Sequence, residues 1–329
     1  MRYTKLLPLF LFLLSLLSSG CKEGAQLMPN ISGKAGEVLV VIAKSEWEGD
    51  SGAAIRATLM ADHPFLPQKE PLFTLISIPE SAFSKIFQSH RNLIIVDIDS
   101  AIKESEMRVR QNVWAAPQVV VTIRAKNSKE LTTIIEESSE SLKNTLLMAE
   151  RNRIIENAKR YEDRAIREEL ANYLEGSLNF PKGYSIKKRG KEFAWVSYET
   201  TYTNQGVFIY RFPYRDTLDL TLERLVAKRD QILKRNVPGP VERSYMITNS
   251  MVEPALYRFR YKGREIWEVR GLWEVENDFM GGPFVSHFFL NQNRDYIIAV
   301  EAFVYAPRYN KRNYLRQVES LLYSYYFFN

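Results

Sequence analysis

Residues 129–175 contain no proline and no glycine, and this run constrains the fold more than any other part of the chain. Proline ends or kinks a helix and glycine weakens it, so a run of this length without either is typical of helical structure. Its apolar residues form two stripes at helical spacing whose phases differ near Asn152: Leu131, Ile135, Leu142, Leu146 and Ala149, then Ile155, Ala158, Tyr161, Ala165 and Tyr173. We therefore predict one long helix, a kinked helix or a hairpin of two helices across 129–176, which divides the chain into two parts.

The stretch "ERNRIIENAKRYEDRAIREE" (150–169) within this segment is rich in charges of both signs. On a helix, mixed charges at these spacings usually form a solvated face with ion pairs between residues four apart. We therefore predict a solvated face here and no docking function.

Strands and helices alternate in the part that precedes the helical segment. Apolar runs of strand length occur at 37–43, 72–78, 93–98 and 118–125. Between them, a helix is expected over 51–62, capped by Asp50 or Ser51, and another from Pro79 to His90. This alternation predicts an α/β layer over 36–128.

The part that follows, 177–329, reads as an antiparallel sheet with flanking helices. Strands are predicted at 184–189, 192–198, 206–212, 284–290 and 295–304, with helices at 219–235 and from Tyr309 onward. The whole chain is thus expected to be a mixed α+β protein.

A hairpin is predicted in "LYRFRYKGREIWEVRGLWEV" (256–275), where aromatic and charged residues alternate. Side chains change face at every strand residue, so placing the aromatic residues of both strands on one side requires an odd number of loop residues. We therefore predict a three-residue turn at 262–264, with Arg258 opposite Glu268.

The first twenty residues have the order of a secretory signal peptide. Arg2 and Lys5 come first, residues 6–17 are almost wholly apolar, and residues 18–20 are small. The apolar run is about a dozen residues long, whereas a helix that crosses a bilayer needs about 20. A permanent membrane span is therefore not expected.

Cys21, the only cysteine of the chain, follows directly. This order resembles a bacterial lipobox, in which the thiol is acylated and the chain is cut just before it. Ser18 departs from the usual pattern, because lipoboxes commonly have Leu at that position; an incidental thiol is the alternative. We predict lipidation of Cys21 and read residues 21–35 as a tether between the lipid and the fold.

Composition and motif searches exclude several classes of function. The net charge of +6 falls to +4 once Arg2 and Lys5 are removed, too little to suggest nucleic acid as a partner. The three histidines are far apart in sequence, and neither a zinc motif nor a phosphate-binding loop occurs. We therefore predict no metal and no cofactor.

Three places in the sequence carry residue types that could be catalytic. "GDSGA" (49–53) resembles the nucleophile motif of trypsin-like proteases, but Ser51 precedes every histidine, and helix capping explains it better. Asp97 and Asp99 lie two residues apart at a strand end, where both carboxylates would point to one face. These two, or the acids near Glu274, are the candidates for an acid/base pair.

A binding surface is suggested by segments 228–240, 269–286 and 305–320, which combine Arg, aromatic residues and loop glycines. The alternative places the tryptophans in the core, Gly281 and Gly282 in a turn, and the basic residues in solvent. The candidate surface residues are Lys228, Arg229, Arg270, Trp273, Arg308, Lys311 and Arg312.

Six stretches spread over the chain resemble a family of Bacteroidetes lipoproteins of unknown function: "LPQKEPLFTL", "FQSHRNLIIVDI", "QGVFIYRFPY", "KRDQILKRNVPGP", "RGLWEVENDFMGGPFVS" and "YAPRYNKRNYLRQVESLLYS". The resemblance implies a lipid-anchored protein of the cell envelope and outer membrane, with neither membrane face favoured, and brings no catalytic residues. We expect a binding or assembly module whose partner is an envelope protein or a small ligand. The alternatives are an enzyme that acts on envelope polymers and a structural spacer.

Overall fold

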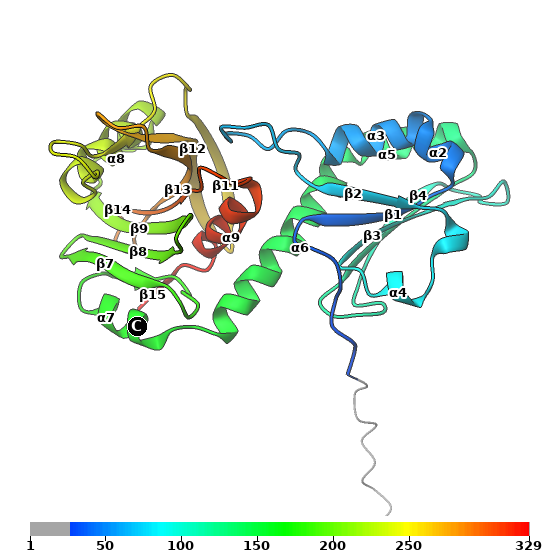
Figure 1. The fold of residues 1–329 in the computed structure, drawn as a ribbon, viewed down its shortest axis with the longest axis horizontal. Helices are drawn as coiled ribbons and strands as arrows, with labels where there is room; N and C mark the ends of the chain where they lie inside the picture. The colour runs from blue at the N-terminus through cyan, green and yellow to red at the C-terminus, as the bar shows by residue number, and fades with distance from the viewer. Residues whose placement is uncertain (1–26, 329) are drawn as a thin grey trace, which may run out of the picture.

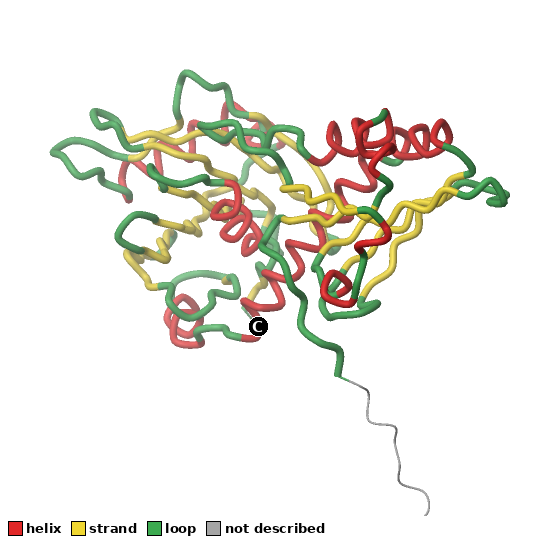
Figure 2. The backbone as a smooth tube through the Cα atoms, turned by 45° about the vertical axis from the view of Figure 1, so that its right-hand side comes forward, coloured by secondary structure: helices red, strands yellow, loops and turns green. Residues whose placement is uncertain are grey.

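The computed structural model describes residues 27–328, so the expected signal peptide and Cys21 lie outside the described residues. The described chain forms two sheet-containing domains, with helices α6 (Ser139–Arg160) and α9 (Arg312–Leu322) between them (Figures 1 and 2). The expected mixed α+β class is confirmed. No helix in this part of the chain is long and apolar enough to span a membrane.

The N-terminal domain is built on a five-stranded sheet in the order β2-β1-β3-β5-β4. Four strands are parallel and β4, at one edge, is antiparallel. The predicted α/β layer is confirmed, although β4 was missed because its sequence, EMRVRQ, is charged and mostly exposed. The strands are β1 (Glu37–Val41), β2 (Thr74–Ile78), β3 (Asn92–Ile98), β4 (Glu106–Gln111) and β5 (Val119–Ala125).

Helices of this domain differ from the sequence prediction in two places. The prediction of a single helix from Pro79 to His90 is wrong: a 3-10 turn (Glu80–Ala82) and the short α4 (Lys85–Gln88) occur there, separated by Phe83 and Ser84. The backbone leaves the helical conformation at Phe83, whose ring packs 5.7 Å from that of Trp114 on one face of the sheet.

Ser51 does not cap a helix. The short α2 (Lys44–Glu48) is followed by α3 (Asp50–Leu59), whose N-cap is Gly49. The Ser51 hydroxyl instead lies 3.0 Å from both Glu46 Oε2 and Thr132 Oγ1, and the residue is buried. Its role is thus to tie α3 to the neighbouring helices.

The long helical segment consists of three helices, α5 (Ser128–Glu137), α6 and α7 (Arg164–Ala171). The first half of α6 packs into the N-terminal core and its second half into the C-terminal core. Leu142 and Leu146 belong to the first core, Ile154 and Ala158 to the second. The change of phase near Asn152 therefore marks where α6 passes from one domain to the other.

The C-terminal domain contains a curled antiparallel sheet of eight strands, in the order β10-β12-β13-β14-β9-β8-β7 with β11 beside β12 (Figure 1). Helix α8 (Leu222–Asn236), after a 3-10 turn (Thr217–Leu220), covers one face, and α9 covers the other. A two-stranded sheet, β6 (Gly176–Ser177) with β15 (Tyr326–Phe327), lies near the C-terminus. The main strands are β7 (Ser185–Gly190), β8 (Phe193–Glu199), β9 (Asn204–Pro213), β10 (Met246–Thr248), β11 (Ala255–Tyr261), β12 (Arg264–Val275), β13 (Gly281–Leu290) and β14 (Tyr296–Tyr305).

Central strands of this sheet are buried on both faces, which explains their almost continuous apolar sequence. On β9, Phe208 and Tyr210 pack on the α8 side, while Val207 and Ile209 pack on the α9 side. The two faces thereby form two separate hydrophobic cores.

The β11–β12 hairpin has a two-residue turn, Lys262-Gly263, so the predicted three-residue turn is wrong. Both turn residues have positive φ, 48° and 79°, as tight hairpins require. Arg258 consequently pairs with Trp267, and its guanidinium lies 5.2 Å from the indole ring. The aromatic residues of the two strands thus lie on opposite faces of the hairpin, because the two-residue turn places Arg258 opposite Trp267 and Tyr257 opposite Glu268.

Gly281 and Gly282 begin strand β13 and do not form a turn. A Cβ on Gly282 would lie 2.1 Å from the carbonyl oxygen of Val304. Glycine is therefore required there for the close approach of two strands.

Candidate functional site

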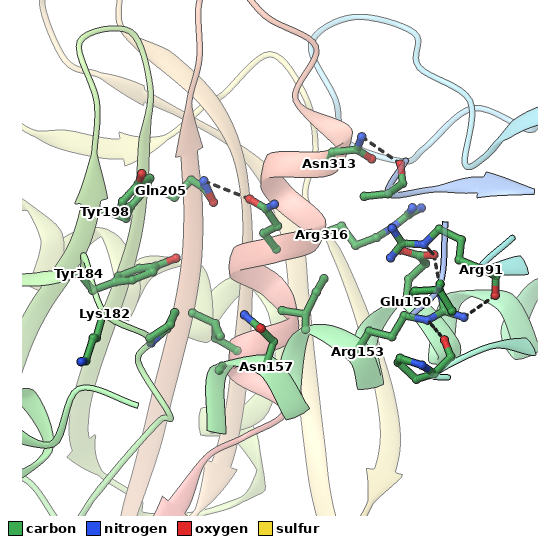
Figure 3. Close-up of a pocket in the computed structure, with 18 residues that line it drawn as sticks. Arg91, Glu150, Arg153, Asn157, Lys182, Tyr184, Tyr198, Gln205, Asn313 and Arg316 are labelled. Atoms are coloured by element: carbon green, nitrogen blue, oxygen red, sulfur yellow. Dashed lines mark hydrogen bonds and ion pairs between the residues drawn. The ribbon is translucent and has the colours of Figure 1, made fainter. Parts of the chain in front are cut away.

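A cavity of about 540 Å³ lies between the two domains (Figure 3). Helices α6 and α9 contribute much of its lining, together with β8, β9 and the first described residues around Ile31. Cavities of this size commonly hold small molecules, and domain interfaces are a frequent location for them. The cavity therefore has the dimensions of a ligand site.

One wall of the cavity carries a buried carboxylate between two arginines. Glu150, on α6, accepts hydrogen bonds of 2.9 Å each from Nε and Nη2 of Arg91, and one of 2.8 Å from Nη1 of Arg153. Asn92 adds a fourth donor at 2.8 Å. The Glu150 side chain is only 1% exposed, so these donors replace water around its charge.

Arg316, on α9, brings a third guanidinium to the same wall (Figure 3). Its Nη2 donates to the carbonyl of Leu72 at 2.7 Å, and its guanidinium lies 4.9 Å from the ring centre of Phe73. Burial lowers the pKa of both Arg153 and Arg316 to about 10, because it disfavours the charged form. Arg91, Arg153 and Arg316 thus face a single carboxylate.

The opposite wall is partly aromatic and carries a cation, Lys182. The rings of Tyr184 and Tyr198 lie 5.8 Å apart, and Gln205 bonds to Gln317 of α9 at 3.4 Å. Within residues 27–328 the two tyrosine hydroxyls and the side-chain amide of Asn157 make no hydrogen bonds to the protein. Figure 3 shows Asn157 on α6 directed into the cavity. Polar groups are therefore available on this wall to a bound molecule.

The two domains are fixed around the cavity by hydrogen bonds between α9 and the N-terminal domain. Arg312 Nη1 donates to the Pro71 carbonyl at 2.7 Å, next to the bond from Arg316 to Leu72. The carboxylate of Glu70 accepts the backbone N–H of Arg312. These contacts join segments of chain that are 240 or more residues apart.

Two family models match the chain, each described as a domain of unknown function: residues 31–159 match DUF8532 and residues 163–324 match DUF4837. Together the two matched regions cover most of the chain, and neither description states a function. Their boundary, at residues 160–162, coincides with the end of α6. The cavity therefore lies between the DUF8532 domain and the DUF4837 domain.

No curated protein matches the chain. A crystal structure of a Bacteroides thetaiotaomicron protein aligns with 8% identity and a TM-score of 0.27. The alignment covers 47% of this chain and 46% of that one, so the chain spans less than half of the matched protein's length.

The predicted binding-surface residues do not form one surface. Arg229 and Trp273 are buried on the α8 side of the DUF4837 sheet, where Arg229 pairs with Glu301. Arg270 lies on the α9 side with its side chain 13% exposed, paired with Glu268 and Glu319. Both Arg side chains thus form internal ion pairs, and the Trp side chain packs in the core. The same pattern of Arg and Trp in sequence also fits an exposed surface, so the sequence alone does not distinguish the two.

Other members of the set lie elsewhere. Lys311 and Arg312 are buried at the domain interface, Lys228 is half-buried on α8, and Arg308 is exposed with its guanidinium 5.0 Å from the ring of Tyr202. The seven residues thus occupy separate locations in the fold.

The candidate catalytic acids lie away from the cavity. Asp97 is half-exposed and pairs with Arg124 at 2.9 Å, while Asp99 accepts the backbone N–H of Ala101 beyond the end of β3. Glu274 bonds to Asn249 in the DUF4837 domain. Among the described residues, no three His, Cys, Asp or Glu side chains come together as a metal site.

The cavity residues were missed because the charged stretch 150–169 was predicted to be a solvated face. The side chains of Glu150 and Arg153 are instead only 1% and 8% exposed, since α6 passes between two domains at this point. One feature of the sequence could have indicated this burial. The phase of the apolar stripe changes near Asn152, which lies between Glu150 and Arg153 in the sequence.

Proposed function

We propose that the chain is a lipid-anchored module of the bacterial outer membrane that binds a small molecule in the cavity between its two domains. The observation that supports this most is the cavity itself, which combines a charged wall with a wall of polar side chains that lack protein partners. Binding sites for small molecules have this combination of apolar lining and a few convergent polar groups.

Membrane attachment rests on the sequence from Met1 to Cys21 and on the length of chain that follows. Ile31 lines the cavity and is ten residues from Cys21. A fully extended chain of ten residues reaches at most ~36 Å. A lipid on Cys21 would therefore keep the cavity close to the membrane surface, whichever face of the membrane carries the protein.

Binding explains the cavity better than hydrolysis does. Among the described residues that line the cavity, Glu150 is the only acid, and two arginines and an asparagine already occupy its oxygens. Acid/base hydrolysis of glycans generally uses two carboxyl groups about 5 to 10 Å apart across the substrate. We expect no nucleic acid partner, in keeping with the mild net charge.

Attachment is tested by labelling cells with an alkyne analogue of palmitate. Wild-type protein should carry the label and sediment with outer membranes, whereas Cys21→Ser should be unlabelled and should leave the membrane fraction or remain uncleaved. Equal labelling and fractionation of the two would overturn the anchor.

Ligand binding is tested with full-length lipidated protein in detergent and a small-molecule extract of its own envelope. Asn157→Trp should fill the cavity without breaking an ion pair, and Lys159→Trp on the same helix lies outside it. We expect the extract to raise the melting temperature of wild type and Lys159→Trp but not of Asn157→Trp. No response in the wild type, or an equal response in all three, would contradict the proposal.

A further inference from the structure

The charged wall of the cavity holds more positive than negative charge. The single negative charge of Glu150 offsets one of the three positive charges of Arg91, Arg153 and Arg316. The other two positive charges have no carboxylate in contact with them among the described lining residues. Nearby carboxylates are engaged elsewhere: Glu70 accepts backbone N–H groups of α9, and Glu319 pairs with Arg270.

Donors on this wall also lack acceptors. Nη1 of Arg316 is buried without a hydrogen-bond partner, and the whole residue is 6% exposed. Nη1 of Arg91 makes no hydrogen bond within residues 27–328, because Arg91 reaches Glu150 through Nε and Nη2. Buried polar groups in folded proteins nearly always have a partner, so the buried, unpaired Nη1 of Arg316 points to an acceptor that binds there. Nη1 of Arg91 is not buried, and it offers a second free donor on the same wall.

Gly36 keeps room for this arrangement. A Cβ at Gly36 would lie 2.7 Å from Nη1 of Arg316. The guanidinium therefore occupies space that any other residue at position 36 would take.

We propose that the charged wall binds a carboxylate or phosphate group of the ligand, with Arg91 donating to its oxygens and Arg153 and Arg316 supplying further positive charge. The planar guanidinium suits both groups, because its parallel N–H donors match two oxygens of a carboxylate or phosphate. The rest of the molecule lies toward Tyr184, Tyr198 and Asn157. This inference rests on the proposed function and names the chemistry of the ligand.

The first experiment uses simple anions as probes on the full-length lipidated protein. Inorganic phosphate or acetate replaces chloride at constant ionic strength, and thermal unfolding is followed. We expect at least one of the two to raise the melting temperature of wild type and of Arg164→Gln, which changes an exposed arginine outside the cavity. Arg91→Gln should lose the shift, and Arg91→Lys should keep part of it, because lysine retains the charge without the fork.

The shift in melting temperature is measured for each variant relative to the same variant in chloride. A lower stability of Arg91→Gln in chloride therefore does not affect the comparison. A shift of equal size in Arg91→Gln and wild type would overturn the proposal. So would the absence of any shift with either anion.

The second experiment separates this inference from the proposed function. The envelope extract is divided by anion exchange, and each fraction is added to wild type, Arg91→Gln and Asn157→Trp. We expect the stabilising activity in the retained fraction, with loss in both variants; phosphatase treatment then distinguishes a phosphate from a carboxylate. The stabilising activity could instead be in the neutral flow-through, with the response lost in Asn157→Trp and kept in Arg91→Gln. That result would overturn the proposal that the ligand is an anion, while the cavity would remain a binding site. No activity in any fraction would overturn both.

Discussion

Glu70 caps the helix that begins at Arg312, across the boundary between the two domains. Its carboxylate oxygens accept the backbone N–H groups of Lys311 at 2.6 Å and Arg312 at 3.0 Å, at the N-terminus of α9. A negative charge at this end of a helix meets both the unpaired N–H groups and the positive end of the helix dipole. Since α9 also lines the cavity, Glu70 helps to set the position of one cavity wall relative to the other domain.

We predict that Glu70→Gln lowers the free energy of unfolding by about 1–2 kcal/mol, because the amide is uncharged and offers one acceptor oxygen where the carboxylate offers two. Urea denaturation measures the change. Glu80→Gln is the control, since Glu80 is exposed and makes no ion pair among the described residues. Equal stability of the Glu70 and Glu80 variants would contradict the role of Glu70 as a cap.

A matched pair of glycines tests the close packing around Arg316. Gly36 and Gly263 have similar positive φ, 75° and 79°, but a Cβ at Gly263 would have nothing within 4 Å. Alanine at either site bears the strain of the left-handed conformation, roughly 1 kcal/mol. We predict that Gly36→Ala destabilises more than Gly263→Ala in urea, because only at Gly36 must the Arg316 guanidinium move. The same loss at both sites would show that the guanidinium is free to adjust.

The pair formed by Arg229 and Glu301 lies entirely inside the DUF4837 domain. Both side chains are 0% exposed, and two hydrogen bonds of 2.7 and 2.9 Å join them. Removing one partner of a buried pair leaves an uncompensated charge, so Arg229→Met should cost about 3–5 kcal/mol. The double variant Arg229→Met/Glu301→Leu should regain part of that loss. A double-mutant cycle in which the two losses simply add would refute the coupling.

Sequence patterns predicted the secondary structure best where a single rule decided it. The buried strands β1, β3, β5, β9 and β14 were found because apolar runs of strand length have few other interpretations. The edge strand β4 was missed, since an exposed edge needs no apolar residues. The hairpin register was missed because the prediction placed the aromatic residues of both strands on one face, whereas the tight turn at Lys262-Gly263 fixes the register.

The cavity could not be predicted from the sequence, because its residues come from distant segments. The charged residues of α6 among them have a pattern that normally predicts an exposed helix face. Glu150 pairs with Arg91, 59 residues away, and Arg316 reaches the carbonyl of Leu72, 244 residues away. Whether a charged residue of a helix is exposed or buried depends on what packs against it. On α6, a second domain packs against the face that carries Glu150 and Arg153. The apolar stripe of α6 changes phase where the helix passes from one domain to the other. This change indicates the position of that point in the sequence, but it does not indicate which residues of the two domains meet there.

Stability should fall as the pH drops below about 6.5 because of two buried histidines. Burial lowers the pKa of His63 and of His90 from 6.5, since the charged imidazolium is disfavoured away from water. The unfolded chain therefore takes up these protons at a higher pH than the folded chain does. The stabilisation is complete above pH 6.5 and is lost as the pH falls toward the lowered values, by at most about 1.4 kcal/mol per pH unit for each histidine. Urea midpoints between about pH 8 and about pH 5.5 measure this slope. We expect the double variant His63→Gln/His90→Gln to have a flatter profile than the wild type over this interval, whatever its stability at pH 8. The same slope in both proteins would assign the pH dependence to other groups.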